Sequence, residues 1–252
     1  MIGLMCAMPE EAARLRQAMV GLRVERRGRR EFLLGQLFER DVVLTVSRCG
    51  KVAAAATVAA MIERYSVAPL VVTGTAGALA DRLAVGDLVV ADSLIQYDLD
   101  ASAIPRFKKY EVPLLGVSRF RSDAALTPLA ETAAREFVEH DLNREIPPGR
   151  LAELGMCQPR VVRGMIASGD RFIARSEERT GLLRELPEAL CVEMEGAAAA
   201  QVAYEYDVPV VVIRTISDTA DHRAPVAFEQ FLEHIVAHVT FGVVRRFFAR
   251  LS

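Results

Sequence analysis

The stretch Cys191-Val-Glu-Met-Glu-Gly-Ala-Ala-Ala-Ala-Gln201 places two glutamates next to an alanine-rich run. Ionised carboxylates are costly to bury without partners, so Glu193 and Glu195 need an explanation in this apolar context. Further along, Val208-Pro-Val-Val-Val-Ile-Arg-Thr-Ile-Ser-Asp218 has the pattern of a buried strand that ends on another carboxylate. Ligands bind beyond the carboxyl ends of strands in open parallel sheets. These stretches therefore predict a buried sheet with an acidic site at its edge.

Glu11 stands at the same kind of junction near the start of the chain. Residues 2–8 are continuously apolar, as expected for a core strand, and Pro9-Glu10-Glu11 favours the first turn of a helix that continues to Met19. A single acid of this kind is usually structural, because it pairs with an arginine or caps a turn. Several acids at element junctions favour a ligand site instead.

The rest of the chain alternates between strand and helix patterns. Strands are predicted at 31–37, 41–47, 69–73, 85–92, 157–168 and 208–216, and helices from about 51 to 65, at 123–140, at 175–185 and at 226–250. We expect a glycine turn at 74–78, a long loop at 94–120, an exposed connection at 143–149 and a solvated hairpin turn at 23–30. Without repeats or a break in composition, residues 1–252 are predicted to form one α/β domain with a mixed sheet.

Composition argues against several classes of protein. A formal charge of −2 gives no electrostatic case for a nucleic-acid partner, and no apolar run reaches the ~20 residues that span a bilayer. No targeting segment is visible. The cysteines are widely spaced and form no CxxC pair: Cys6, Cys49, Cys157 and Cys191. This spacing favours reduced thiols in a cytoplasmic protein. His234 and His238 lack the glutamate of a zinc motif, so we expect no metal.

An ordered set of motifs runs from residue 2 to about residue 232. In order, they are Ala7-Met8-Pro9-Glu10-Glu11, Gly50-Lys51-Val52-Ala53-Ala54, Thr73-Gly74-Thr75-Ala76-Gly77, Val85-Gly86-Asp87, Ser168-Gly169-Asp170, Val192-Glu193-Met194-Glu195 and Ile216-Ser217-Asp218. Each motif is weak alone, but the set resembles the 5′-methylthioadenosine/S-adenosylhomocysteine nucleosidases of the purine nucleoside phosphorylase superfamily. The resemblance implies a three-layer α/β/α fold of nucleoside phosphorylase type. It also implies a homodimer. The apolar, alanine-rich helix from Val52 to Met61 either forms the interface of this dimer or simply packs on the sheet.

The resemblance further implies roles for individual residues. Asp218 resembles the general acid that protonates adenine N7, with Ser217 orienting it. Glu11 resembles the residue that positions the attacking water, and Glu195 the one that binds the ribose hydroxyls. The other residues expected around the nucleoside are Met8, Cys49, Thr75, Ala76, Gly77, Phe172, Ile173, Glu193, Met194, Arg214 and Phe228. The chemistry agrees, since protonation neutralises a poor leaving group and carboxylates stabilise an oxocarbenium-like sugar without any cofactor.

This chain departs from the family pattern near the 5′ end of the expected nucleoside. Arg48-Cys49-Gly50 stands where these nucleosidases usually have Gly-Ile-Gly, and Thr75 replaces the usual serine. The loop from Tyr97 to Leu115 is longer and more charged than the family norm. Arg48 is either a surface residue or one that recruits an anionic 5′ group or phosphate.

Three functional hypotheses follow. The first is hydrolysis of a 5′-substituted adenosine, the second is phosphate-dependent cleavage on the same fold, and the third is nucleoside binding without catalysis. Phosphorylases need cationic side chains for phosphate, and Val72 stands where the hexameric bacterial enzymes have one such arginine. Glu11 suits water better than an anion, so hydrolysis is favoured. The presence of Glu11, Glu195 and Asp218 ranks the non-catalytic hypothesis last.

Overall fold

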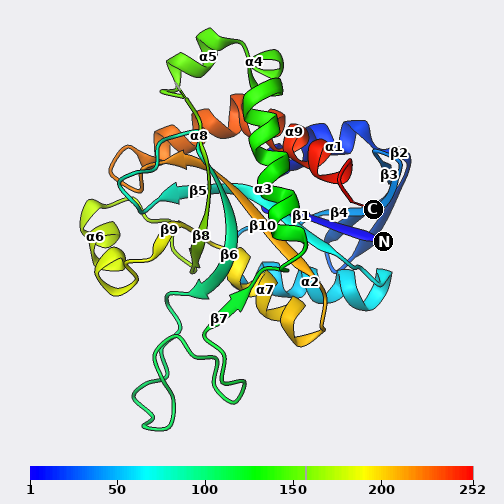
Figure 1. The fold of residues 1–252 in the computed structure, drawn as a ribbon. Helices are drawn as coiled ribbons and strands as arrows, with labels where there is room; N and C mark the ends of the chain where they lie inside the picture. The colour runs from blue at the N-terminus through cyan, green and yellow to red at the C-terminus, as the bar shows by residue number, and fades with distance from the viewer. Residues whose placement is uncertain (157, 252) are drawn as a thin grey trace.

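A mixed β-sheet forms the centre of the computed structural model, which describes residues 1–156 and 158–251 (Figure 1). The strands lie in the order β10 (Val210–Asp218), β6 (Leu88–Gln96), β8 (Val161–Ser168), β9 (Ala189–Glu193), β5 (Leu70–Ala78), β1 (Ile2–Cys6), β4 (Arg40–Val46), β3 (Arg30–Leu37) and β2 (Val20–Arg27), with β7 (Arg119–Arg121) beside β6. Parallel pairs such as β1–β5 and antiparallel pairs such as β10–β6 occur together, which confirms the predicted mixed sheet.

The sheet divides at β5, because this strand has three partners. One edge of β5 pairs with β10 along its length, while the other pairs with β1 near Val71 and with β9 near Gly77. Since β9 pairs with β8, β8 with β6 and β6 with β10, five strands close into a ring. The prediction of an edge site assumed an open sheet. The closed part instead brings the carboxyl ends of β5, β9 and β10 to one place.

Helices cover both faces of the sheet, as expected for three layers (Figure 1). On one face lie α2 (Lys51–Tyr65) and α7 (Gly196–Glu205), and on the other lie α1 (Pro9–Ala18), α3 (Leu126–Glu136), α8 (Ala224–His234) and α9 (Val236–Phe248). The alanines of α7 are mostly buried, and their small side chains let this helix pack closely on the sheet and α2. A further helix, α6 (Ser176–Glu185), packs beside β8 and β9.

Two predicted helices are wrong in their extent. The segment expected as one helix over 226–250 is divided at Ile235, whose fully buried side chain lies at the junction of α8 and α9. The segment expected as one helix at 123–140 forms α3 and then a π-helical turn, η1 (Phe137–Asp141). Phe137 packs there against Gly242 of α9, where a methyl group would overlap its ring. The expected connection at 143–149 is partly helical, in α4 (Leu142–Glu145) and α5 (Pro148–Glu153).

Four local predictions also need correction. Residues 74–78 are not a turn, because β5 continues through them and pairs with β10 and β9. The basic run at 23–30 is mainly the exposed edge strand β2, and the turn is limited to Gly28 and Arg29, which both have positive φ. Charged side chains are a common protection for such an edge. The strand expected at 85–92 begins later, at Leu88, and the one expected at 157–168 begins at Val161; Cys157 lies outside the described residues.

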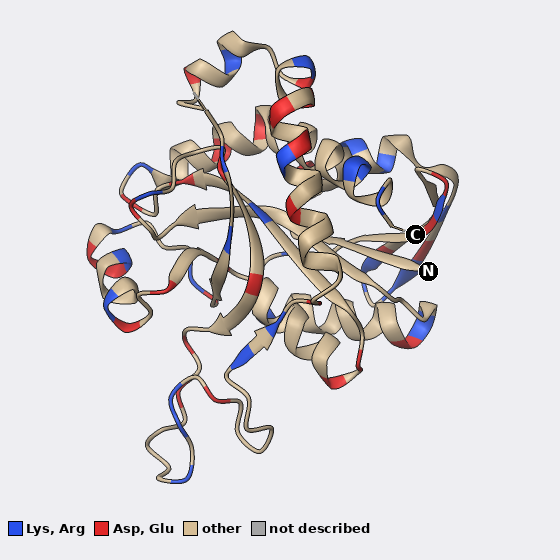
Figure 2. Ribbon diagram, in the orientation of Figure 1, with Lys and Arg blue, Asp and Glu red and all other residues tan. Residues whose placement is uncertain are grey.

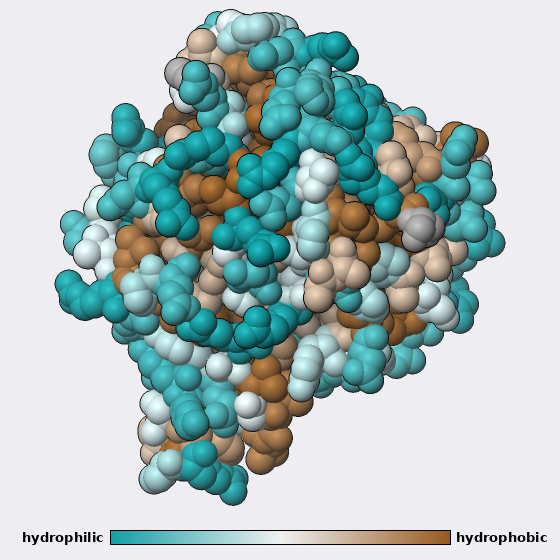
Figure 3. All heavy atoms as spheres, in the orientation of Figure 1, coloured by the Kyte–Doolittle hydropathy of each residue, from teal (hydrophilic) through white to brown (hydrophobic). Residues whose placement is uncertain are grey.

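Charge is spread over the helices, the loops and the exposed strand β2, while the inner strands of the sheet are mostly uncharged (Figure 2). The segment between β6 and β7 projects from the body as a long loop (Figure 1), and apolar residues are exposed on it (Figure 3). In the part of the chain that the structure describes, no helix is long and apolar enough to cross a membrane, and no cluster of His, Cys, Asp and Glu could hold a metal ion. Cys6, Cys49 and Cys191 are free thiols.

Candidate active site

A cavity of about 170 Å³ lies where the carboxyl ends of β1, β5, β9 and β10 meet. Its lining consists of Ala7, Met8, Glu11, Cys49, Thr75, Ala76, Gly77, Arg171, Phe172, Ile173, Val192, Glu193, Met194, Glu195, Ser217, Asp218 and Phe228. All residues predicted for the site line this cavity except Arg214, which lies beneath it. The sequence analysis missed Ala7, Arg171 and Val192. Ala7 and Val192 each open one of the motifs that carry the family resemblance, which was a signal for them, and Arg171 is next to the predicted Phe172 in the chain.

Arg214 is 1% exposed and interacts with the carboxylates on which the site is built. Its Nη2 donates to Oε2 of Glu193 and, at 3.4 Å, to Oε2 of Glu195. Glu11 lies close by, because a Cβ added to Gly74 would overlap Arg214 and would stand 2.7 Å from Oε1 of Glu11. The absence of a side chain at Gly74 therefore lets the guanidinium and the three carboxylates share one buried space.

Glu193 ties together the elements that form the floor of the cavity. Its carboxylate accepts hydrogen bonds from the backbone N–H groups of Glu195 (3.0 Å) and Gly196 (2.8 Å), at the first turn of α7. A carboxylate at a helix N-terminus satisfies N–H groups that have no partner within the helix. The Ser168 hydroxyl at the end of β8 also donates to Glu193 and accepts from the Ala197 N–H at 2.7 Å. Glu193 thus joins β8, β9 and α7.

Glu11 and Glu195 both line the cavity beside this cluster. Oε2 of Glu11 accepts from the backbone N–H groups of Ala7 (2.8 Å) and Met8 (3.0 Å), and Oε1 accepts from Thr75 N (3.1 Å) and Oγ1 (3.3 Å). Oε1 of Glu195 accepts from Gly50 N at 2.9 Å. Burial raises the pKa of both carboxyls, and neighbouring Glu193 raises that of Glu195 further, whereas Arg214 opposes both shifts. The cluster therefore resists holding three full negative charges.

Asp218 ends β10 at a separate part of the cavity. Its Oδ1 accepts from Ala220 N at 2.9 Å, and its Oδ2 accepts from the Ser217 hydroxyl at 2.8 Å. Burial raises the pKa of Asp218, although these two hydrogen bonds oppose the shift. A Cβ on Gly77 would come 2.9 Å from Oδ1, so Gly77 makes room for this carboxyl as Gly74 does for Glu11. Gly74 and Gly77 are three residues apart, which is ~10 Å in an extended strand. Glu11 and Asp218 are therefore separated along β5.

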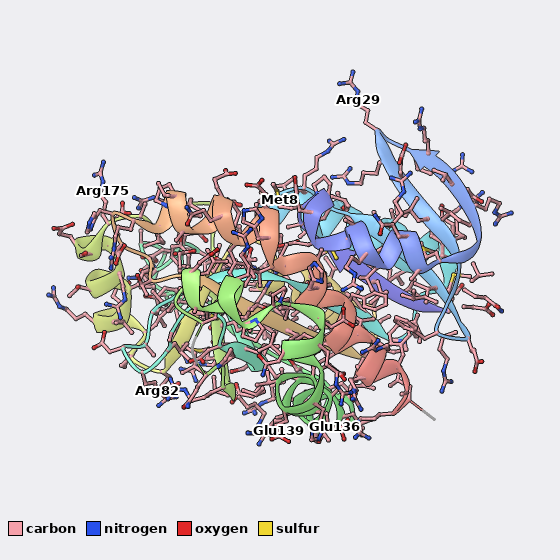
Figure 4. All side chains as sticks on the ribbon, turned by 90° about the horizontal axis from the view of Figure 1, so that it is seen from above. Met8, Arg29, Arg82, Glu136, Glu139 and Arg175 are labelled. Atoms are coloured by element: carbon pink, nitrogen blue, oxygen red, sulfur yellow. The ribbon has the colours of Figure 1, made fainter. Side chains whose placement is uncertain are left out.

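Aromatic and sulfur-containing side chains form the mouth of the cavity. The rings of Phe172 and Phe228 meet edge to face, with centroids 5.4 Å apart and planes at 66°. Phe172 is 44% exposed, so one of its faces is open to a flat apolar ligand. The Cys49 thiol lies 3.5 Å from the Met8 sulfur, and Met8 lies between the ends of α1 and α8 (Figure 4).

Comparison with known proteins gives a consistent family. The phosphorylase superfamily model matches residues 1–249. A 5′-methylthioadenosine/S-adenosylhomocysteine nucleosidase from Staphylococcus haemolyticus is 34% identical over 232 residues, 92% of either chain. The crystal structure of the Neisseria meningitidis nucleosidase in complex with methylthio-immucillin-A has a TM-score of 0.86 at 32% identity and covers 99% of both chains. The S. pneumoniae nucleosidase with the transition-state inhibitor MT-ImmA has a TM-score of 0.85, also at 32% identity, over 100% of this chain and 99% of that one. The matched residues include the whole cavity.

Arg214→Met tests whether one cation holds the buried carboxylates. Removing one partner of a buried ion pair costs about 3–5 kcal/mol, so we expect a loss of this size in the free energy of unfolding. Because the folded-state pKa values of Glu11 and Glu195 already lie above the usual 4.5, each carboxyl stabilises the fold less as pH rises from that value. Without Arg214 this decline is steeper.

Urea unfolding at pH 5 and at pH 8 measures the effect. The deficit of Arg214→Met should be larger at pH 8, whereas Arg214→Lys keeps the charge and should follow the pH dependence of the unsubstituted protein more closely. Equal deficits at the two pH values would contradict the electrostatic account of this cluster.

Proposed function

The chain belongs to the 5′-methylthioadenosine/S-adenosylhomocysteine nucleosidase family of the phosphorylase superfamily and is an N-glycosyl hydrolase. We propose a role in the reaction for each of the main residues of its cavity. Its substrate is a 5′-substituted adenosine of the methylthioadenosine or S-adenosylhomocysteine type, and its products are adenine and the substituted ribose. The observation that carries this proposal is a buried acid, Asp218, across one cavity from Glu11 and Glu195. Residues 1–252 act as one domain.

Asp218 protonates N7 of the purine as the glycosidic bond breaks. A general acid is most effective when its pKa lies near the working pH, and burial moves the pKa of Asp218 in that direction. The Ser217 hydroxyl donates to Oδ2 of Asp218, and the Ala220 N–H donates to Oδ1. Together these two hydrogen bonds fix the orientation of the carboxyl. The purine stacks on Phe172 and lies against Ile173. Protonation makes the base a neutral leaving group.

The carboxylate cluster acts on the sugar. Glu195 accepts hydrogen bonds from the ribose 2′- and 3′-hydroxyls, with Met194 below the ring, and Arg214 and the Gly50 N–H hold this carboxylate in place. Positive charge that develops on the sugar is stabilised by the nearby carboxylates. Glu11 positions the water. Its four donors occupy the ~4 acceptor sites of a carboxylate, so the water displaces the longest of them, the Thr75 hydroxyl at 3.3 Å.

The charges around the cavity favour water over phosphate as the nucleophile. Among the described residues that line it, Arg171 is the one cationic side chain, and it pairs with Glu178. Arg214 is engaged by Glu193 and Glu195. The Val72 side chain, at the position of a phosphate-binding arginine in some phosphorylases, is buried and apolar. A phosphate here would face carboxylates without a free cation.

A homodimer is the expected assembly, with the outer face of α2 at its interface. Val52 on this helix is 81% exposed, and Leu114 on the projecting loop is 87% exposed. Apolar side chains this exposed are typical of contact surfaces. Sedimentation velocity should give twice the chain mass, and Val52→Lys should shift the protein toward the monomer. A monomer at micromolar concentration would remove this part of the proposal.

Adenine release from methylthioadenosine should not depend on phosphate. We expect equal rates in phosphate-free buffer and with added phosphate, with free methylthioribose as the second product, because water attacks the sugar. The release is followed by the absorbance of adenine, and the sugar is identified by mass spectrometry. A sugar 1-phosphate, or release that requires phosphate, would establish phosphorolysis instead.

Asp218→Asn should separate chemistry from binding. An amide cannot donate the proton, so we expect kcat to fall by about 10²–10⁴-fold while the Kd for methylthioadenosine changes little. Stopped assays measure the rate, and isothermal titration calorimetry measures the Kd. Asp92→Asn, which removes a similar charge from an exposed residue of β6, is the matched control and should retain full activity. Turnover at the unsubstituted rate in Asp218→Asn would remove Asp218 from the mechanism.

A further inference from the structure

We propose that Lys51, Asp98 and Asp170 are positioning residues, which fix the spacing between the part of the cavity that takes the purine and the part that takes the ribose. We call these three residues the charged clamp. None of the three lines the active-site cavity, so they act through residues that do. The inference rests on the proposed function, because it concerns how the same site holds its substrate.

The segment that carries Phe172 has no regular structure to hold it in place. Residues 169–175 form neither a helix nor a strand between β8 and α6. In the proposed function, this segment supplies the aromatic ring on which the purine stacks. An irregular segment takes its position from the contacts that it makes with neighbouring elements. Those contacts therefore decide where the purine lies.

Two consecutive backbone N–H groups at the start of α2 hold one carboxylate from each part of the site. Gly50 N donates to Oε1 of Glu195 at 2.9 Å, and Lys51 N donates to Oδ1 of Asp170 at 2.8 Å. Neighbouring amide nitrogens lie within ~4 Å of each other, so both carboxylates are anchored at one point of the chain. Glu195 is the proposed ribose ligand, and Asp170 lies two residues before Phe172. The start of α2 thus joins the two parts of the site.

The first turn of α2 depends on this distant acid. Its N-cap residue, Gly50, has no side chain to cap the helix, and the first turn contains no acidic residue. A polar side chain at the N-cap position usually satisfies one of the free N–H groups there. Here Asp170, 119 residues further along the chain, does so. A Cβ on Gly50 would come 3.1 Å from Oδ1 of Asp170, and the φ of Gly50 is 99°, so glycine leaves room for the distant cap.

Asp98 completes the charged clamp from the start of the long loop. Its Oδ1 accepts from Nζ of Lys51 at 2.5 Å, and its Oδ2 accepts from Asp170 N at 2.9 Å. The side chains of Lys51 and Asp98 are 16% and 25% exposed, so water screens their ion pair less than it screens a fully exposed pair. Each member of the clamp is thereby bonded to both of the others.

Anchoring of the long loop does not by itself account for the charged clamp. Tyr97 already fixes the start of this loop, because its N–H donates to the Ser168 carbonyl at 3.0 Å and a Cβ on Gly169 would overlap its ring. Asp98, in contrast, directs both of its carboxylate oxygens to other elements. One oxygen reaches the helix that holds the ribose carboxylate, and the other reaches the segment that carries the purine ring.

A substrate that spans both parts of the site is affected by an error in their spacing, whereas a fragment that occupies one part is not. Holding reacting groups in the correct geometry lowers the barrier, and a displacement of ~1 Å can cost ~10²-fold in rate. When the clamp is broken, the purine segment can still adjust to adenine, and the carboxylate cluster can still bind the sugar. The nucleoside needs both at once. We therefore expect a loss for the nucleoside that exceeds the loss for either fragment.

Asp98→Ala removes both links that this carboxylate makes. We expect kcat/KM for methylthioadenosine to fall by about 10–100-fold, because the purine and the sugar are no longer held in register. In an Asp218→Asn background, where the nucleoside is not consumed, Asp98→Ala should weaken the Kd for methylthioadenosine by about tenfold. The Kd values for adenine and for methylthioribose, measured there by isothermal titration calorimetry, should each change by less than about threefold.

Asp100→Ala is the matched control. Asp100 is a carboxylate of the same loop, and its Oδ1 accepts from Ser102 N at 2.9 Å and from Ser102 Oγ at 2.6 Å, within the loop. Asp100→Ala should retain full activity and leave the three Kd values unchanged.

Lys51→Met and Lys51→Arg separate positioning from a general loss of structure. Both keep the backbone N–H that donates to Asp170, but arginine also keeps a cation for Asp98. We expect Lys51→Met to lower kcat/KM by about tenfold and Lys51→Arg to stay within about threefold of the unsubstituted protein. The Tm of Lys51→Met should fall by no more than about 4 °C, because a partly exposed ion pair contributes little to the free energy of unfolding. Equal activity in the two variants would overturn the inference.

The Kd comparison decides between the remaining outcomes. An Asp98→Ala loss that is as large for either fragment as for the nucleoside would overturn the inference, since the clamp would then support one part of the site and not the spacing. If the unsubstituted protein does not cleave the nucleoside, the proposed function fails. The inference then stands if the nucleoside loses more affinity than its fragments, and it is overturned if the losses are equal or the nucleoside does not bind. Should Asp98→Ala not fold, the same comparison is made with Lys51→Met.

Discussion

The contact of Arg214 with the buried carboxylates is the interaction on which the rest of the site depends. The Arg214 guanidinium forms ion pairs with Glu193 and Glu195 and lies close to Glu11. Arg214 is 1% exposed, so it has little access to solvent. Burying several acids around one base is unfavourable unless hydrogen bonds satisfy them. Here the backbone supplies those bonds, from Ala7, Thr75, Gly50 and the first turn of α7. The consequence is that the buried carboxyls of Glu11 and Glu195 have raised pKa values.

The closed ring of strands turns this cluster into a site. In an open sheet, the ends of β9 and β10 would lie apart, but here β5 pairs with both and carries Gly74 and Gly77 between them. Each glycine leaves space for one acid, so a single strand sets the separation between Asp218 and the carboxylate cluster around Arg214. The fold of the phosphorylase superfamily thus brings these acids to one cavity.

The site faces two electrostatic environments. Its interior is lined by buried carboxylates, whereas Arg16, Arg29 and Arg48 line the cavity beyond Met8 and Cys49. The strained backbone at Arg48 lies on this boundary. The acidic interior follows from the motifs shared with the family, while Arg48 on the basic side departs from them.

The sequence by itself determined the mixed α/β class, the family and most residues of the cavity, because buried strands and acids at strand ends leave local patterns that survive without a structure. It did not determine the closure of the ring, the break at Ile235 or the continuation of β5 through Gly74, because these depend on pairing between distant segments. The convergence of Arg16, Arg29 and Arg48 is of the same kind. Arg48 stood out in sequence as a departure, but only the tertiary structure brought its partners from α1 and the hairpin, since side chains far apart in the chain become neighbours only when the elements that carry them pack.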